Sequence, residues 1–364
     1  MMFRAEGCQS AGILLFLVLG FFFHFPVFSS GPLQGKLLDA PQQIYYSFPG
    51  FPAASGLDRS FHLRTQAYYL NEFRGYAFDP EDEVRGSDGR LSDDDRAREL
   101  TAMDYEALVV DGTFSFPWGT DHRCGITLRL YGYYGGLFDP VIEGFHSIFG
   151  LPNASREYFP QGRAYTSINN DRGITIEMDG PSVLFGDTEI FGVWTFAHSP
   201  CTTWALAWAL ELPTGISGTP GGNGHIDAGL QLLYERSLGE SFILHAQQGF
   251  VVPGELLFGS SGSADPFILS QSLLGLEWLF TDDWSFLGQT RIHTSPLSSS
   301  APLNHSMFPD PKQFEMPVTS LQLGLRRTFD TWNLQIYLEQ DFLTHEGPDI
   351  LVSMAADWKT GREQ

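Results

Sequence analysis

The chain has 364 residues, of which 43% are hydrophobic and 18% are charged. The charged share lies below roughly a quarter, the usual value for soluble domains. The formal net charge is −22, and an acidic chain of this kind repels the phosphate backbone, which excludes nucleic acid as a partner. Length alone does not decide between one large domain and two ordinary ones.

The N-terminus has the layout of a secretory signal. Arg4 precedes an apolar run over residues 11–28, and small residues at 29–31 close it. We expect residues 1–30 to be cleaved as a signal peptide and residues 31–364 to form one exported domain. A retained N-terminal membrane anchor is the alternative.

No other stretch has the roughly 20 uncharged apolar residues that a membrane helix requires. Helices and closed barrels are the only structures that satisfy the backbone within lipid. The exported chain is therefore either a soluble periplasmic β-protein or a membrane barrel. Cys124 and Cys201 remain after export and could pair, although nothing in the local sequence brings them together.

The second half of the chain is a run of segments about ten residues long in which apolar and polar side chains alternate. Segment 332–343 is the clearest, with Leu334 and Ile336 on one face and Gln335 and Glu339 on the other. One face suits lipid and the other suits a wet lumen. We expect strands near 187–197, 202–212, 226–236, 241–252, 268–280, 284–294, 318–329, 332–343 and 349–358.

The first half is less regular. Its alternation favours further strands near 42–48, 59–70, 104–115, 122–134 and 172–179. The predicted fold is therefore all-β, a single antiparallel up-and-down transmembrane β-barrel of about 12–14 strands, an even number placing both termini on one side.

The connections between the predicted strands alternate between short turns and longer loops rich in Pro, Gly and Ser, as in outer-membrane barrels. Most tryptophans lie close to a short turn or to the end of the last segment. Indole prefers the headgroup level, so we expect a membrane-interface belt at one rim, with scattered core tryptophans as the alternative. The belt residues are Trp194, Trp204, Trp278, Trp284, Trp332 and Trp358.

One long connection holds a short amphipathic helix, predicted over about 140–149 because its apolar residues recur at helical spacing between Pro140 and Gly150. It carries Glu143, Phe145 and His146. The helix could plug or gate the lumen, lie at the membrane interface, or pack on a loop.

Titratable residues also fall on the predicted inner face of the barrel. They could line a channel or pair across a closed lumen, and a barrel of about 12–14 strands is wider than side chains alone readily fill. The lumen-facing candidates are Arg64, Arg129, Glu189, Glu235, His245, Glu277, Arg291, His293, Arg326, Glu339 and Asp341.

Four short motifs stand out along the chain: the start Gly31-Pro32-Leu33, the stretch Ile142-Glu143-Gly144-Phe145-His146, the pair Gly186-Asp187 and the run Glu211-Leu212-Pro213-Thr214-Gly215. At these residues the chain resembles the domain-of-unknown-function 3187 family. The resemblance covers most of residues 31–358. It implies an exported, outer-membrane β-barrel of unknown activity and brings no catalytic residues. Six residues follow Trp358, whereas barrel proteins often end in an aromatic residue.

These features favour a passive outer-membrane channel or transport protein for small molecules in a Gram-negative-type cell. Its expected partners are the outer-membrane lipid bilayer and the barrel-insertion machinery. The alternatives are an outer-membrane lipid-modifying hydrolase, with a His and a Ser from different strands, and a structural or adhesion barrel without transport. No catalytic residue, cofactor or metal site is expected, and the oligomeric state is open.

Overall fold

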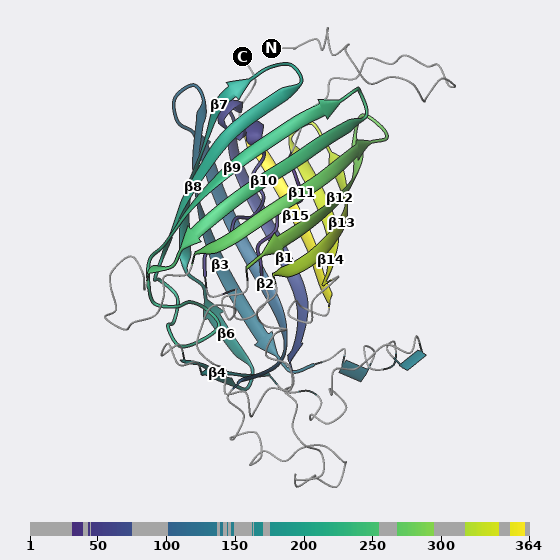
Figure 1. The fold of residues 1–364 in the computed structure, drawn as a ribbon. Helices are drawn as coiled ribbons and strands as arrows, with labels where there is room; N and C mark the ends of the chain where they lie inside the picture. The colour runs from purple at the N-terminus through teal and green to yellow at the C-terminus, as the bar shows by residue number, and fades with distance from the viewer. Residues whose placement is uncertain are drawn as a thin grey trace, which may run out of the picture.

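A closed barrel of 12 antiparallel strands makes up most of the described part of the chain (Figure 1). The structure is a computed structural model that describes residues 31–38, 43, 45–74, 101–136, 139–140, 144, 147–148, 162, 164–169, 175–254, 268–294, 317–341 and 350–360. The barrel strands are β1 (Phe61–Arg74), β2 (Thr101–Pro117), β3 (His122–Tyr134), β7 (Thr188–His198), β8 (Thr202–Leu212), β9 (Asp227–Leu238), β10 (Phe242–Val252), β11 (Leu269–Leu279), β12 (Trp284–His293), β13 (Val318–Thr328), β14 (Trp332–Asp341) and β15 (Ile350–Thr360).

Each barrel strand pairs with its neighbour, and the first strand pairs with the last. The seam between β1 and β15 runs from Phe61 opposite Thr360 to Asn71 opposite Ile350. Because all these pairings are antiparallel, both ends of the barrel sequence lie at the rim that carries the short turns. The fold class predicted from the alternation is thereby confirmed, and the strand number lies at the lower end of the predicted range.

Three short strands lie outside the barrel proper. Strands β4 (Tyr165–Asn169) and β5 (Thr175–Asp179) form a hairpin that pairs with the start of β2. Strand β6 (Ser182–Phe185) pairs with the last residues of β3, whose earlier residues pair with β7. The strand predicted near 172–179 therefore exists in part, as β5, but is not a barrel strand.

The outer face of the barrel is apolar. In β8, Ala205, Ala207 and Ala209 are buried inside, while Trp208 and Leu210 between and beyond them are exposed outside. Large apolar side chains project outward from strands all round the barrel, among them Leu128 (59% exposed), Leu230 (51%), Leu274 (60%) and Met354 (54%). Such a surface would be costly in water and suits hydrocarbon.

The six tryptophans of the expected belt all lie near strand ends at the short-turn rim. Trp332 begins β14 and is paired with Trp358 of β15. The Arg327 guanidinium lies 5.1 Å from the Trp284 ring, and the indole of Trp194 stacks on His122. The remaining two, in β8 and β11, are partly exposed on the outer face.

Two further predictions from the sequence concern the short helix near 140–149 and the pairing of the cysteines. Asp139, Pro140, Gly144, Ser147 and Ile148 are helical, and Ile148 is 80% exposed, but Glu143, Phe145 and His146 lie outside the described residues. Cys124 is a free thiol, so it does not pair with Cys201. In the residues that the structure describes, no helix has the length and apolarity needed to cross a membrane.

Candidate functional site

Residues 31–57 are here called the luminal segment, of which 31–38, 43 and 45–57 are described. The described residues run inside the barrel (Figure 1). The segment starts near the short-turn rim, where Arg326 binds Gly31. It reaches the opposite end, where Tyr46 binds Asp227 at the start of β9, and returns to the short-turn rim as the 3₁₀ helix η2 (Ala53–Leu57).

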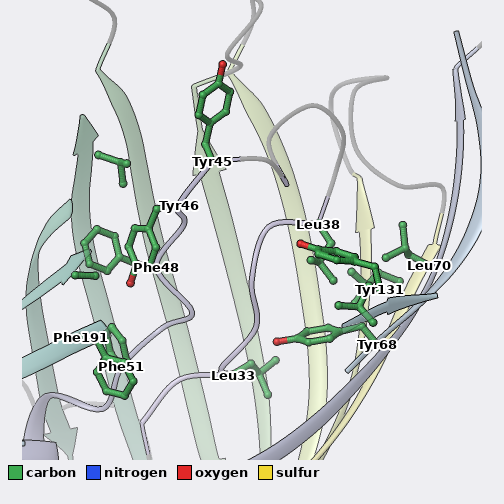
Figure 2. Close-up of a cluster of buried hydrophobic side chains, with 14 of the residues drawn as sticks. Leu33, Leu38, Tyr45, Tyr46, Phe48, Phe51, Tyr68, Leu70, Tyr131 and Phe191 are labelled. Atoms are coloured by element: carbon green, nitrogen blue, oxygen red, sulfur yellow. The ribbon is translucent and has the colours of Figure 1, made fainter. Parts of the chain in front are cut away.

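The prediction of a strand near 42–48 is wrong, because the described residues of this stretch belong to the luminal segment. Their aromatic side chains are buried against the inner wall (Figure 2). The ring of Phe48 is fully buried, and the ring centroid of Phe51 lies 4.8 Å from that of Phe191 in β7. Burying one such ring contributes about 1.5–3 kcal/mol.

The wall is shaped to accept Phe48. A Cβ on Gly229 or on Gly249 would each come within 2.8 Å of the Phe48 ring. These two glycines lie on the adjacent strands β9 and β10. Because neither glycine has a side chain, the two positions leave a recess in the wall that holds the Phe48 ring.

Glutamine side chains of the wall satisfy the backbone of the luminal segment. Gln289 accepts from the Leu33 N–H at 2.9 Å and donates to the Leu33 carbonyl at 3.1 Å. Gln271 does the same for Phe48, at 3.1 and 2.8 Å. Gln247 donates to the Phe51 carbonyl. A buried segment outside the sheet needs such partners because unpaired backbone groups are costly.

Charged wall residues bind the same backbone. Arg326 donates to the carbonyls of Gly31 and Pro32 at 2.7 and 3.1 Å, and also pairs with Glu277 at 2.9 Å. Arg291 donates to the carbonyls of Gly35 and Phe48. Glu235 accepts from the Ala53 N–H at 2.7 Å.

Most other lumen-facing candidates are also buried. His245 lies between Glu235 at 3.6 Å and Glu277 at 3.2 Å. Glu339 accepts from Ser320 at 2.6 Å, and Arg64 is half-buried and donates to the Gln34 carbonyl at 3.2 Å. His293 is buried in β12. Asp341 is paired with Ser320 in the strand register, but its side chain lies outside the described part.

Lys36 of the luminal segment makes the closest ion pair with the wall. Its ammonium lies 2.5 Å from a carboxylate oxygen of Glu189, and both side chains are buried. Arg129 approaches the same carboxylate at 3.4 Å while binding Asp111 through two hydrogen bonds of 2.7 and 2.8 Å.

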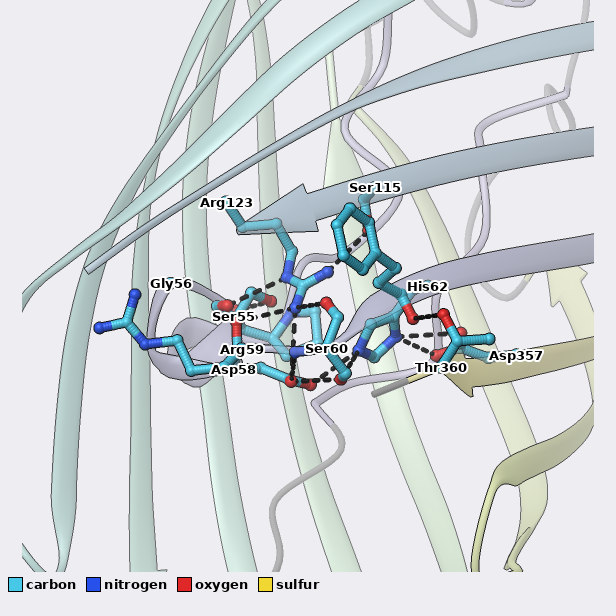
Figure 3. Close-up of polar contacts among 12 residues, drawn as sticks. Ser55, Gly56, Asp58, Arg59, Ser60, His62, Ser115, Arg123, Asp357 and Thr360 are labelled. Carbon is cyan, nitrogen blue, oxygen red and sulfur yellow. Dashed lines mark hydrogen bonds and ion pairs between the residues drawn. The ribbon is translucent and has the colours of Figure 1, made fainter. Parts of the chain in front are cut away.

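The C-terminal end of the luminal segment is held by a polar clamp at the short-turn rim (Figure 3). His62 binds Asp58 at 2.7 Å through Nε2 and Asp357 of β15 at 3.1 Å through Nδ1. Arg123 donates to the carbonyls of Ser55, Asp58 and Ser60. Burial alone would raise the pKa of Asp58, but hydrogen bonds from His62 and Ser60 outweigh it and hold that pKa well below the usual range.

Ser60, His62 and Asp357 contain the residue types of a hydrolase triad, with the Ser60 hydroxyl 3.0 Å from Nε2 of His62. The same Nε2 is, however, 2.7 Å from Asp58. A ring nitrogen that donates to a carboxylate is not free to accept the serine proton. The arrangement therefore favours a charged clamp over an activated nucleophile.

Sequence reasoning missed the luminal segment, the three glutamines and Arg123. The glutamines carried a usable signal, because each falls on an inward position in the period-two pattern of its strand. The contact between Lys36 and Glu189 carried none, because it joins positions far apart in the chain.

The closed barrel defines the chain as having the fold of outer-membrane β-barrel channels. The structure of the COG4313 outer membrane channel from Pseudomonas putida F1 is similar with a TM-score of 0.50 and 13% identity, covering 84% of this chain and 98% of that one. A FadL homologue from Pseudomonas aeruginosa matches with a TM-score of 0.43 and 10% identity, covering 92% and 99%.

The chain belongs to the family described as "Protein of unknown function (DUF3187)", whose model matches residues 96–359. The resemblance predicted from the sequence motifs is thereby confirmed. The matched region contains β2 to β15 and excludes the luminal segment. A comparison with curated proteins finds no match.

Proposed function

We propose that the chain is an outer-membrane transport protein for small molecules whose lumen is closed at rest by the luminal segment. Residues 1–30 would be removed on export, leaving Gly31 at the start of this segment. The apolar outer face supports the membrane location, and the polar inner wall supports an aqueous path once the segment is displaced.

The observation that carries the proposal is the way in which the segment is held. Its backbone is bound by side chains of the wall, among them Gln271, Gln289, Arg291 and Arg326. Each such bond exchanges for a bond to water at a net cost of about 0.5–1.5 kcal/mol. Because wall side chains and not strand backbones make these bonds, the segment would leave the lumen without breaking the ladders of the barrel.

The gate is then formed by residues 31–57, and not by the helix near 140–149 that the sequence suggested. The role of that helix stays a prediction. The clamp at Asp58 and His62 would keep the C-terminal end of the segment attached to the rim, so that opening is a hinged withdrawal and not a loss of the whole segment.

Solute uptake by proteoliposomes tests the proposal with the full chain. We expect low uptake of a small sugar by the unchanged protein and higher uptake by Phe48→Ala, because truncation of a buried aromatic ring costs about 3–5 kcal/mol of docking. Phe250→Ala is the matched control, since Phe250 lies on the outer face of β10 and is 51% exposed.

A barrel that stays sealed in the unchanged protein and in Phe48→Ala would refute transport and favour the structural or adhesion alternative. Cell fractionation with heat-modifiable gel mobility tests the location separately. Recovery in the soluble periplasmic fraction would refute the membrane assignment.

A further inference from the structure

Three carboxylates lie side by side on the inner wall, in a group here called the acidic row. Glu189 of β7 is paired in register with Glu211 of β8, and Glu211 is paired with Asp227 of β9. All three side chains are buried. Like charges directly opposite each other destabilise a sheet, so a positive group beside a buried row of this kind stabilises it.

The carboxylates of the acidic row differ in the hydrogen bonds that their oxygens accept. Asp227 accepts from the N–H groups of Tyr46 and Gly254 at 3.0 and 2.9 Å and from Asn223 at 3.1 Å. Glu211, by contrast, has one carboxylate oxygen without a hydrogen-bond partner, although only 3% of the residue is exposed. The row therefore contains an unfilled acceptor aimed into the buried lumen.

The positive group beside the row is the Lys36 ammonium. It lies 2.5 Å from Glu189 and 3.9 Å from the centroid of the Tyr46 ring. Carboxylates with an aromatic face are the surroundings in which proteins bind ammonium groups. Lys36 and Tyr46 both belong to the luminal segment and not to the wall. When the segment withdraws, the cation and the aromatic ring leave together, and the carboxylates of the acidic row remain on the wall.

Arg129 does not take the place of the Lys36 ammonium when the luminal segment withdraws. Its guanidinium is bound by both oxygens of Asp111 and reaches Glu189 only at 3.4 Å. Without Lys36, the carboxylates of Asp111, Glu189 and Glu211 would face a single arginine. The wall is then strongly attractive to a cation of lysine-like shape.

We propose that the acidic row is a binding site for a primary ammonium group, and that Lys36 occupies it in place of an amine-bearing solute. This inference rests on the proposed function and deepens it by naming the class of solute. An alkylamine that competes for Glu189 and Glu211 favours the withdrawn state of the luminal segment, because a ligand shifts an equilibrium only through differential affinity.

The test is a chemical rescue on the full chain in detergent. Lys36→Ala removes the four terminal heavy atoms of the side chain, which correspond to n-propylammonium. We expect isothermal titration calorimetry to show saturable binding of n-propylammonium chloride to Lys36→Ala. The unchanged protein and Lys359→Ala, in which Lys36 still fills the site, should bind at least tenfold more weakly.

Two controls separate recognition of charge from cavity filling. n-Propanol has a similar shape without the charge and should not bind to Lys36→Ala. Adding Glu189→Gln to Lys36→Ala should weaken the binding of propylammonium at least tenfold. Equal binding to all variants, or equal binding of propanol, would overturn the proposal.

A second measurement covers the case in which Lys36→Ala does not fold. In the unchanged protein, n-propylammonium should accelerate hydrogen exchange of residues 31–57 relative to the same concentration of sodium chloride, and Glu211→Gln should reduce this effect. No acceleration would count against the site. These readouts do not involve transport, so a sealed barrel that binds the amine would refute only the proposed function.

Discussion

The glutamine contacts of the luminal segment allow the sharpest test of how it is held. The double variant Gln271→Ala/Gln289→Ala removes four hydrogen bonds between wall side chains and the backbone of Leu33 and Phe48, with distances of 2.8 to 3.1 Å. It leaves the strand ladders of β11 and β12 intact, because those ladders use only backbone groups.

The magnitude follows from the number of bonds lost. At about 0.5–1.5 kcal/mol for each hydrogen bond, the double variant weakens docking of the segment by about 2–6 kcal/mol. At about 1.4 kcal/mol for each factor of ten, the ratio of withdrawn to docked segment rises by roughly one to four powers of ten.

Hydrogen exchange followed by mass spectrometry measures this ratio directly. Peptides from residues 31–57 should exchange faster in the double variant, whereas peptides from β7 to β10 should not change. Gln248→Ala is the control, because Gln248 binds Gly249 and Ser270 on its own sheet and is only half-buried. Unchanged exchange of the segment in a folded double variant would refute the view that side-chain hydrogen bonds hold it.

Three further outcomes are expected. Gly249→Val fills the recess for Phe48 and should cost about 1–3 kcal/mol of docking, measured by the same exchange experiment. Burial raises the pKa of Asp187 from 3.8 to about 6, so its ionisation opposes folding. This opposition is complete above about pH 6 and fades as the pH falls from about 6 to 3.8. Asp187→Asn should therefore stabilise the barrel by at most about 3 kcal/mol at neutral pH and by less at about pH 4, measured by urea unfolding, and an equal gain at both values would contradict this. Leu274→Arg should destabilise the barrel in lipid vesicles by about 2–4 kcal/mol, and an unchanged urea midpoint would argue against a lipid-facing surface there.

The strands were predictable because the two faces of the barrel wall meet different surroundings. Large apolar side chains face outward, and many inward positions carry polar or small residues, so a period-two pattern survives in the sequence. Segment 332–343 illustrates this, since Ile336 and Leu338 are exposed outside while Gln335 and Glu339 are buried inside. The turns between β7 and β8 and between β13 and β14 were predictable for the same reason, because the pattern stops there.

The luminal segment was not predictable from this pattern. Tyr46 and Phe48 alternate with Ser47 as they would in a strand, but these residues belong to neither a strand nor a helix. Periodicity reports which side chains share a face, but it does not report whether the backbone is paired with a neighbouring strand or with side chains such as Gln271. The glycines that accept Phe48 gave no signal in the sequence either, because the recess exists only once the two strands and the ring lie together.

The clamp around His62 has a consequence for assembly. One of its carboxylates comes from residue 58 and the other from residue 357, so the three groups meet only after β1 has paired with β15. Synthesis delivers the N-terminal part first and the last strand nearly three hundred residues later. The contact from His62 to Asp357 therefore forms only when the seam closes, so the attachment of the luminal segment to the rim is completed together with the barrel itself.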